Sequence, residues 1–363
     1  MYNQMKYSIN KEGNFAYMQI YEQIKKDIVS GALSFGSKLP SKRLLCEETG
    51  VSVITAQHAY SILCDEGYIE AKERSGYFVI YKESDFLSTA DFHSEPSPVV
   101  LSGERAESDF PFSTLAKTVR KVLSEKGEEV LKKSPNQGLS ELRASIAKYL
   151  LRSSGVDAKA EQIVIGAGAE YLYGLILQLL GKDRIYALED PSYEKISQVY
   201  SANGVKFQML KMGRNGIKTT ELEKSNASVL HITPFNSFPS GITASVSKRQ
   251  EYLKWAQKRE GFIIEDNYSA ELTVSKKNED TVFALSKSGR VIYLNTFSQT
   301  IAPSMRIGYM VLPERLVDDF KEILGFYSCT VPVLDQYVIT ELIESGDFER
   351  HINRVRRKKR KLK

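Results

Sequence analysis

Two short apolar runs, Val291–Leu294 and Ile307–Leu312, enclose a polar loop, and this pattern constrains the fold more than any other stretch of the chain. Each run is typical of a buried strand. The loop between them carries Ser298, Gln299 and Arg306. Polar groups at strand ends are characteristic of α/β proteins, which hold anionic ligands at that edge of the sheet. The stretch therefore predicts a ligand site between the ends of two strands.

Length and composition predict a soluble protein with more than one domain. A chain of 363 residues can hold two or three domains, and 42% apolar and 26% charged residues are ordinary globular values. No run of about 18 apolar residues occurs, so we expect no membrane span. Met1–Ile20 lacks the apolar core of a signal peptide, which indicates the cytoplasm. The 3 cysteines and 4 histidines lack the spacing of a disulfide framework or a metal site.

The net charge of +5 is concentrated at one end of the chain. The last fourteen residues, Arg350–Lys363, carry nine Lys/Arg and no acidic residue, so the remainder is net acidic. The charge therefore does not argue for nucleic-acid binding by the whole surface. The basic segment could be an arm that contacts phosphate, but the pattern from Phe348 onward favours an amphipathic helix.

The sequence pattern of residues 1–82 predicts three helices followed by a hairpin. Apolar residues at helical spacing indicate a first helix that ends near Gly31, and Ser41 and Ser52 are placed to cap a second and a third. Two short apolar runs joined by the polar turn Lys72–Gly76 predict the hairpin. Three helices with a tight turn between the last two, followed by a hairpin, make a winged helix-turn-helix.

This segment resembles the DNA-binding head of GntR-family regulators. The resemblance rests on Leu39-Pro-Ser-Lys-Arg43, Gly50-Val-Ser52, Glu66-Gly-Tyr68 and Ser75-Gly-Tyr-Phe-Val79. It implies that the starts of the second and third helices and the hairpin wing contact a double-stranded DNA operator, where helix N-termini and hydroxyl groups meet phosphate. The residues that it assigns to DNA binding are Ser41, Lys42, Arg43, Ser52, Thr55, Arg74 and Gly76.

One position departs from the GntR pattern. The family has an arginine directly after the Val-Ser of the third helix, and this chain has Val53. The head is also nearly neutral, with ten Lys/Arg against nine Asp/Glu over residues 1–82. We therefore expect weaker DNA binding than in a typical relative, with a modest dependence on salt. A packing module of the same shape that binds no DNA is the alternative.

After residue 82 the pattern changes twice. Residues 83–108 lack periodicity and contain prolines, serines and acidic residues, which is typical of a linker. Residues 109–363 alternate between helical and strand patterns and predict an α/β domain with a mostly parallel sheet. Within it, a short apolar strand leads through Gly166-Ala-Gly168 into a helix. The small residues let backbone N–H groups at the helix start surround an anion, although glycines at such a turn can also be simple steric relief.

The large domain resembles fold-type I aminotransferases, and the order of the two domains resembles the MocR branch of the GntR family. The matching phrases are the glycine turn, Glu189-Asp-Pro-Ser-Tyr193, Thr233–Gly241, Phe262–Tyr268 and Phe297-Ser-Gln-Thr300. The resemblance implies a cradle for pyridoxal 5'-phosphate. Its members would be Gly168, Ala169, Glu170, Ser298 and Arg306 around the phosphate, Tyr193 on the ring, Asn236 at the phenolic oxygen, and Asp266 with Tyr268 at the pyridine nitrogen.

The chemistry of two members is compatible with the roles that the resemblance implies. Asp266 ends an apolar strand, and a carboxylate beside the pyridine nitrogen keeps that nitrogen protonated. Asn236 replaces the histidine of the family's loop but can still hydrogen-bond an oxygen. The structural alternatives are a helix cap for Asp266 and simple packing for Tyr193.

The position of the cofactor-binding lysine in this family is Gln299. Glutamine is neither a nucleophile nor a base near neutral pH, so the resemblance implies no covalent link and no catalytic residue. Lys287 and Lys321, the nearest lysines in the sequence, lie outside the two apolar runs. Relatives continue for roughly another hundred residues, so we expect a C-terminally incomplete domain that lacks the arginine for a substrate carboxylate and exposes an apolar face.

The sequence therefore predicts a winged helix-turn-helix (1–82), a linker (83–108) and a fold-type I aminotransferase-like α/β domain (109–363). The expected function is a cytoplasmic MocR-type transcriptional regulator that binds DNA as a homodimer. Its large domain would sense an amino-acid or vitamin effector and would hold pyridoxal or pyridoxamine phosphate non-covalently. A pyridoxal-phosphate-dependent aminotransferase and a non-functional truncated remnant are the alternatives.

Overall fold

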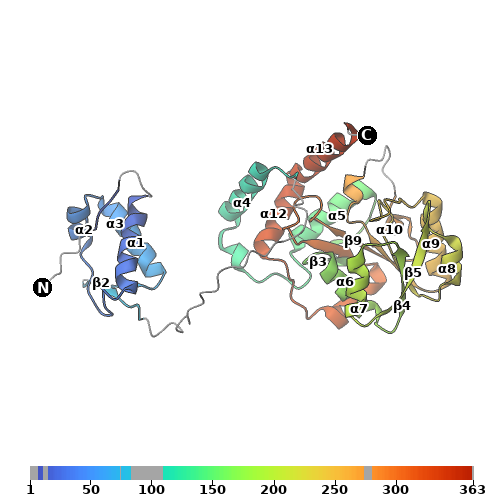
Figure 1. The fold of residues 1–363 in the computed structure, drawn as a ribbon, viewed down its shortest axis with the longest axis horizontal. Helices are drawn as coiled ribbons and strands as arrows, with labels where there is room; N and C mark the ends of the chain where they lie inside the picture. The colour runs from blue at the N-terminus through green and yellow to red at the C-terminus, as the bar shows by residue number, and fades with distance from the viewer. Residues whose placement is uncertain (1–6, 11–14, 74, 83–108, 274–279, 362–363) are drawn as a thin grey trace. The chain divides into compact units, whose positions relative to one another are not determined.

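The structure is a computed structural model, and the residues that it describes are 7–10, 15–73, 75–82, 109–273 and 280–361. The chain forms two compact units, Met1–Ser102 and Gly103–Lys363 (Figure 1). The segment 83–108, which the sequence predicts as a linker, lies outside the described residues.

The first unit consists of three helices and a two-stranded hairpin. Their bounds are α1 (Ala16–Val29), α2 (Lys42–Thr49), α3 (Val53–Asp65), β1 (Ile69–Lys72) and β2 (Gly76–Val79). The hairpin is antiparallel, with Ile69 paired to Val79 and Lys72 to Gly76. Helix α1 packs on α3, and Ile24 and Tyr60 are fully buried in the core of this unit. The arrangement confirms the predicted winged helix-turn-helix.

Serine caps begin the second and third helices, as the sequence predicts. The Ser41 hydroxyl accepts a hydrogen bond from the Leu44 backbone N–H, and the Ser52 hydroxyl accepts one from the Thr55 backbone N–H, both at 3.2 Å. Each cap satisfies one of the N–H groups that a helix start leaves without an internal partner, which is worth about 1 kcal/mol. The Tyr60 hydroxyl also donates to the Pro40 carbonyl at 2.9 Å and so fixes the approach to α2.

The second unit is built on an eight-stranded sheet with the order β3-β10-β9-β8-β7-β4-β5-β6. Strands β5, β4, β7, β8 and β9 run parallel, whereas β10 is antiparallel to both β9 and β3, and β6 is antiparallel to β5. The sheet is therefore mostly parallel, as predicted. The strand bounds are β3 (Ile163–Gly166), β4 (Ile185–Asp190), β5 (Lys206–Gly213), β6 (Gly216–Ile217), β7 (Val229–Ile232), β8 (Phe262–Asp266), β9 (Val291–Thr296) and β10 (Gly308–Val311).

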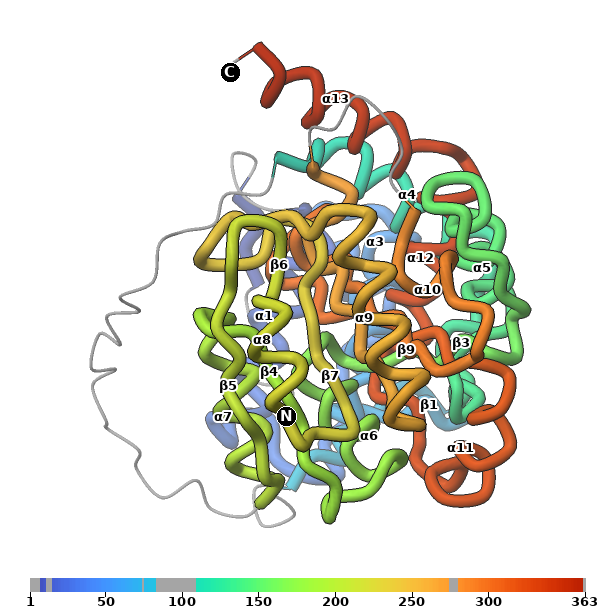
Figure 2. The backbone as a smooth tube through the Cα atoms, turned by 90° about the vertical axis from the view of Figure 1, so that its right-hand side faces the viewer, coloured from blue at the N-terminus to red at the C-terminus, as the bar shows by residue number. Residues whose placement is uncertain are grey.

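Helices cover both faces of this sheet (Figures 1 and 2). Along β10, Met310 points into one core with α6, α7 and α11, while Tyr309 and Val311 point into another with α5, α12 and α13. This alternation follows from the two-residue period of a strand and explains why β10 is apolar throughout. The helix bounds are α4 (Phe112–Lys126), α5 (Ser140–Ser154), α6 (Ala169–Leu180), α7 (Glu194–Ala202), α8 (Thr219–Lys224), α9 (Val246–Lys258), α10 (Val282–Leu285), α11 (Val317–Leu324), α12 (Val333–Glu344) and α13 (Asp347–Lys361).

The basic segment at the end of the sequence forms an amphipathic helix. Helix α13, red in Figure 2, buries Phe348, Ile352 and Val355 and carries basic residues along its length, four of them in the last turn. The helix predicted from Phe348 onward is therefore confirmed. Arg356 Nε also donates to the Glu271 carbonyl oxygen at 2.6 Å, which links α13 to the short 3₁₀ helix Ala270–Leu272.

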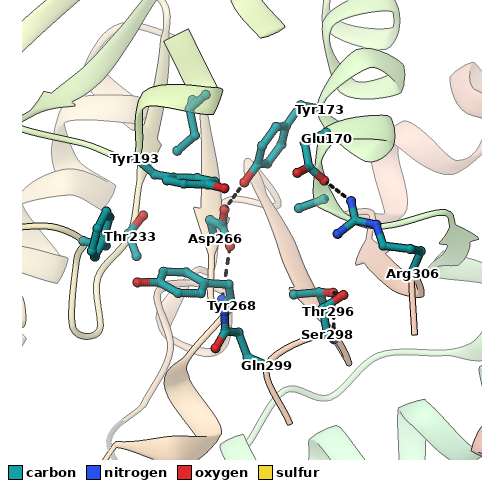
Figure 3. A pocket seen from close by; sticks show the side chains of 13 residues that line it. Glu170, Tyr173, Tyr193, Thr233, Asp266, Tyr268, Thr296, Ser298, Gln299 and Arg306 are labelled. Carbon is teal, nitrogen blue, oxygen red and sulfur yellow. Dashed lines mark hydrogen bonds and ion pairs between the residues drawn. The ribbon is translucent and has the colours of Figure 1, made fainter. Parts of the chain in front are cut away.

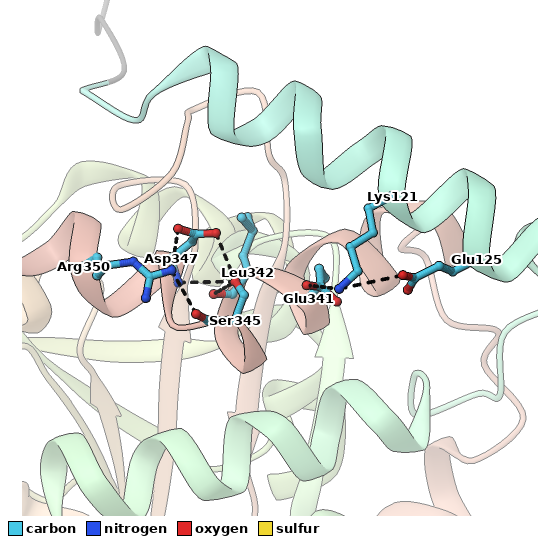
Figure 4. Close-up of polar contacts among 7 residues, drawn as sticks. All are labelled: Lys121, Glu125, Glu341, Leu342, Ser345, Asp347 and Arg350. Atoms are coloured by element: carbon cyan, nitrogen blue, oxygen red, sulfur yellow. Dashed lines mark hydrogen bonds and ion pairs between the residues drawn. The ribbon is translucent and has the colours of Figure 1, made fainter.

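Polar contacts join the helices on this side of the sheet (Figure 4). Lys121 Nζ of α4 lies 2.7 Å from Glu341 Oε1 of α12. At the end of α12, Arg350 Nη2 donates to the Ser345 carbonyl at 2.9 Å and to Asp347 Oδ1 at 2.7 Å. Because these groups are exposed or partly solvated, water screens their interactions, and the buried apolar clusters hold the helices in place. None of the helices in the described ranges is both long and apolar enough to cross a membrane.

Candidate functional site

A cavity of about 260 Å³ opens at the carboxyl ends of β7, β8 and β9, beside the starts of α6 and α7 (Figure 3). Parallel strands bring their carboxyl ends to one edge, which is where α/β proteins bind ligands. The lining residues are Ala169, Glu170, Tyr173, Tyr193, Ile196, Thr233, Phe238, Asp266, Tyr268, Thr296, Ser298, Gln299 and Arg306.

Asp266 is the buried anionic group of this cavity. It ends β8, and only 2% of its surface is exposed. The Tyr173 hydroxyl donates to Asp266 Oδ2, and the Tyr268 backbone N–H donates to Oδ1 at 3.1 Å. Burial, followed by the nearby Asp266 charge, raises the pKa of Tyr173 well above its ordinary value, so this phenol remains a hydrogen-bond donor. The carboxylate is thus oriented and can accept a further proton donor from a ligand.

A second layer of polar side chains lies beside Asp266. His231 Nε2 is 3.8 Å from Asp266 Oδ2, and His231 Nδ1 is 2.9 Å from the Tyr200 hydroxyl. His231 is buried, and its Nε2 has no hydrogen-bond partner among the described residues. A small movement of Asp266 toward His231 would satisfy that nitrogen. His231 and Tyr200 are therefore buried polar neighbours of Asp266 that do not themselves line the cavity.

An arginine–glutamate pair forms the cationic end of the cavity. Arg306 Nη2 lies 2.6 Å from Glu170 Oε2, and Lys195 Nζ lies 3.7 Å from Glu170 Oε1. Partial burial opposes ionisation of Glu170, but hydrogen bonds from its own backbone N–H and from Arg306 hold its pKa below the ordinary range. Glu170 also stands in the first turn of α6, where the helix dipole favours a negative charge. This corner of the cavity is therefore an anion site, occupied here by the chain's own carboxylate.

Glycines allow the segments around this corner to approach one another. Gly168 precedes α6 with φ 91°, a conformation that other residues rarely adopt, and a Cβ there would lie 2.9 Å from Arg306 Nη2. At Gly308, the first residue of β10, a Cβ would lie 3.1 Å from the Asn295 carbonyl and 3.3 Å from the Gly168 carbonyl carbon. The lack of a side chain at these two positions therefore allows the Arg306 loop to lie against the start of α6.

The loop between β9 and β10 carries Ser298 and Gln299. The Ser298 hydroxyl donates to the Met305 carbonyl at 2.9 Å, and the Thr296 hydroxyl donates to Ser298 Oγ at 3.1 Å. These two hydrogen bonds hold the loop in its turn. Ser298 therefore stabilises the conformation of the loop in addition to placing a hydroxyl at the cavity. Gln299 is exposed yet lines the cavity. Its amide can donate and accept hydrogen bonds but cannot take up a proton near neutral pH.

Tyr193 and Phe238 form an aromatic rim on the opposite side. Their ring centroids are 6.1 Å apart and their planes meet at 77°, an edge-to-face arrangement. Asn236, which the sequence predicts to contact the cofactor, is exposed and does not line the cavity. Its backbone has φ 52°, and its carbonyl accepts a long hydrogen bond of 3.4 Å from the Tyr268 hydroxyl. The turn at Asn236 brings Phe238 to the cavity instead.

The cavity thus gathers seven of the nine residues that the sequence predicts for a cofactor. Gly168 lies directly beside it, and Asn236 lies outside its lining. The sequence analysis missed Tyr173, although it stands three and four residues after Glu170 and Ala169 and must share their helix face. The other lining residues that it missed are Ile196, Thr233, Phe238 and Thr296. Thr233 and Phe238 lie within the matching phrase Thr233–Gly241, whereas Ile196 on α7 and Thr296 at the end of β9 reach the cavity through the packing of these elements.

The predicted DNA-binding residues lie at the starts of α2 and α3 and on the wing, with Arg74 outside the described residues. Lys42 Nζ is 3.4 Å from Gln57 Oε1 of α3 and 5.9 Å from the centre of the Tyr77 ring on β2. Lys42, at the start of α2, therefore lies close to both α3 and the wing, so these three elements share one surface. Arg43, Ser41 and Ser52 are exposed, whereas Lys42, Thr55 and Gly76 are half-buried.

Glu189, near the end of β4, is a buried acid close to the cavity. Burial, partly offset by a hydrogen bond of 2.6 Å from the Ser237 hydroxyl, raises its pKa to about 8. In the unfolded chain the same group ionises near its ordinary pKa of 4.5. Between these two values the native state holds a proton that the unfolded state has lost, so raising the pH favours unfolding.

We predict that the free energy of unfolding of the large domain falls as the pH rises from about 5 to about 8. Replacing Glu189→Gln keeps the hydrogen bond from Ser237 but removes the proton, so the fall becomes shallower. Urea unfolding at several pH values measures this difference. Glu322→Gln, at an exposed position, is the matched control and should keep the original slope. An identical slope in the Glu189→Gln protein would contradict a buried, protonated Glu189.

Comparisons with known proteins agree with both units. Residues 16–79 match the family "Bacterial regulatory proteins, gntR family", and residues 106–363 match "Aminotransferase class I and II". Among solved structures, an archaeal alanine:glyoxylate aminotransferase is similar with a TM-score of 0.61 and 23% identity, over 67% of this chain and 62% of that one. LysN, the α-aminoadipate aminotransferase of Thermus thermophilus, gives 0.60 and 27%, over 68% and 64%. The chain thus spans less than two thirds of these enzymes, and the likeness shows the fold.

Curated relatives share both units in the same order. The HTH-type transcriptional regulator YdeL of Bacillus subtilis is 34% identical over 95% of this chain and 77% of its own length. The probable rhizopine catabolism regulatory protein MocR of Rhizobium meliloti is 27% identical, over 94% and 74%. The pyridoxine biosynthesis regulator PdxR of Corynebacterium glutamicum is also 27% identical, over 93% and 75%. The chain therefore belongs to the MocR-type transcriptional regulators, in which a GntR helix-turn-helix is joined to an aminotransferase-like domain.

Proposed function

We propose that this regulator binds operator DNA through its head and uses its aminotransferase-like domain to bind pyridoxal or pyridoxamine phosphate reversibly, without catalysis. The proposal rests on one observation above all. Gln299 lines the cavity together with Asp266, Tyr193 and Arg306, so the anchoring groups are present while the amine is not. A site of this kind can sense a ligand but has no group to transform it.

The residues of the cavity fit the cofactor. Asp266 would accept the proton of the pyridine nitrogen, Tyr193 would lie against the ring, and Arg306 with the first backbone N–H groups of α6 would bind the phosphate. His231 Nε2 has no hydrogen-bond partner among the described residues and lies 3.8 Å from Asp266 Oδ2. This polar neighbour is compatible with an Asp266 carboxylate that pairs with a protonated pyridine ring. When bound, the cofactor supplies a protonated ring that withdraws electrons from an attached group.

The chain's own groups limit what the site can do with that ring. Lysine at position 299 would supply a nucleophile and a proton carrier, and the Gln299 amide supplies neither. Tyr173 stays a donor to Asp266, so its phenol is not available as a base at neutral pH. Tyr268, whose pKa burial also raises, is likewise protonated there. Binding and orientation therefore remain as the functions of the cavity.

The phosphate must compete with Glu170 for Arg306. The two side chains are 2.6 Å apart, and a second anion at the same guanidinium would be repelled unless Glu170 moves or takes up a proton. This competition lowers the affinity for the cofactor and makes binding easily reversible. A sensor needs such reversibility, because its occupancy must follow the concentration of free ligand.

We also propose a cytoplasmic homodimer that binds paired half-sites, with an amino-acid or vitamin effector. This part rests on the family resemblance and on the HTH-type regulators that match along almost the whole chain. The helix-turn-helix geometry supports it, since two heads spaced by a dimer read half-sites one or more helical turns apart. The alternative hypotheses for the function of this chain are a pyridoxal-phosphate-dependent aminotransferase and a non-functional remnant.

Borohydride reduction after loading with pyridoxal phosphate tests the cofactor part. By peptide mass spectrometry, we predict no covalent adduct on the peptide that contains residue 299 of the unaltered chain and an adduct on that peptide of Gln299→Lys, because only the variant offers an amine at that position. Gln299→Arg is the matched control: it adds a cation that is not a nucleophile and should remain unlabelled.

A stoichiometric adduct on a residue of the cavity in the unaltered protein would overturn the proposal. If such a protein also transferred amino groups above background, the aminotransferase reading would replace it. A chain that neither folds as a dimer nor retains DNA at low salt would support the remnant reading instead.

The salt dependence of DNA binding tests the head. Arg43→Ala should weaken binding to all sequences alike and reduce the slope of log K against log salt by about 0.9, as expected for one lost phosphate contact. Lys26→Ala, in the last turn of α1, is the control and should leave the slope unchanged. Fluorescence anisotropy with the full chain at several salt concentrations measures both. Equal slopes for Arg43→Ala and the unaltered protein would contradict a phosphate contact at Arg43.

A further inference from the structure

The first turn of α3 exposes two branched apolar side chains. Val53 is 50% exposed and Ile54 is 82% exposed, directly after the capping Ser52. The opposite side of α3 buries Ala56 and Tyr60 in the core of the head. Exposed apolar residues are common singly, but two adjacent ones at the start of a helix-turn-helix reading helix stand where specific contacts are made.

The surroundings of this pair are polar and cationic. The exposed Gln57 stands one turn further along α3, and Lys42 Nζ lies 3.4 Å from its Oε1. The hydroxyls of Ser52 and Thr55 are 2.8 Å apart at the helix start, and Arg43 is exposed on α2. The other exposed large apolar residues of the described head are Phe15, Val29 and Phe35, in the α1 region and the loop before α2, and Leu44, which is 38% exposed on α2. The apolar pair is thus a small patch inside a surface suited to a polyanion.

We propose that Val53 and Ile54 read the 5-methyl groups of thymine in the major groove. This inference rests on the proposed DNA binding and deepens it. The thymine methyl is the one apolar feature of a base pair on that groove floor, and branched apolar side chains fit it. Gln57 adds an amide on the same face, a group suited to adenine. The first turn of α3 therefore selects A·T pairs, whereas an arginine at position 53 would favour guanine or phosphate.

A protein surface is the other occupant that such a patch could have. The charges argue against it, because a protein partner would bury Lys42 and Arg43 beside the apolar pair and would have to supply matching acids. DNA supplies phosphates at the two helix starts and methyl groups between them. The observations therefore favour DNA, and a protein partner becomes an outcome of the test.

The test begins with DNA that the full chain selects from randomised duplexes of about 30 base pairs, long enough for two half-sites. Each thymine of the selected site is then replaced singly by deoxyuridine, which removes the methyl group and nothing else. We expect at least one replacement per half-site to weaken binding about fourfold, the value of one buried methyl group.

Alanine variants show which side chain contacts the thymine methyl group. In Ile54→Ala or Val53→Ala, the same deoxyuridine replacement should lose most of its effect, because the methyl no longer has a partner. Val29→Ala, another exposed valine of the head, is the matched control and should keep the full fourfold effect. Val53→Arg should bind with a steeper salt slope and with less dependence on the methyl groups.

The outcomes distinguish a failure of the proposed DNA binding from a failure of the proposed thymine contact. If no sequence is enriched and DNA is not retained at low salt, the proposed DNA binding fails. If the chain binds selected DNA but deoxyuridine has no effect at any position, or has the same effect in Ile54→Ala and Val53→Ala as in the unaltered protein, the thymine contact is overturned. Loss of dimerisation in Val53→Ala and Ile54→Ala, with unchanged DNA selectivity, would assign the patch to a protein contact instead.

Discussion

The antiparallel placement of β10 between β3 and β9 is the constraint on which the cavity depends. Gly308 pairs with Gly166 on one side and with Thr296 on the other, so the ends of three strands meet at one point. The start of α6, the loop after β9 and Arg306 are brought together there. A Cβ at Gly308 would lie 3.1 Å from the Asn295 carbonyl oxygen, so the neighbouring strand would have to shift by a few tenths of an ångström.

Much of this arrangement could be predicted from local sequence patterns. The apolar runs around Leu294 and Met310 form β9 and β10, and Asp266 ends its strand as its position after an apolar run indicates. What could not be predicted depends on distant segments. The ion pair of Arg306 and Glu170 joins residues 136 positions apart. Asn236 lies outside the lining of the cavity because its backbone turns there, with a positive φ of 52°. The sequence of the loop does not specify this turn.

One residue in each unit is central to the two proposals: Gln299 in the cavity and Val53 at the start of α3. Neither side chain carries a positive charge near neutral pH. In the proposed account, the cavity binds its ligand without reacting, and the head reads thymine methyl groups as well as phosphates. The Arg306–Glu170 pair would then set how tightly the cavity binds an anionic ligand.

The affinity for pyridoxamine phosphate tests this account most directly, since that ligand carries the ring and the phosphate but cannot react with a lysine. Isothermal titration of the full chain should give saturable binding at one site per chain. Pyridoxamine without the phosphate should bind much more weakly, and Glu170→Gln should bind the phosphorylated form more tightly, because Arg306 is then free of its internal anion. Equal affinities for the two ligands, or weaker binding by Glu170→Gln, would contradict the account.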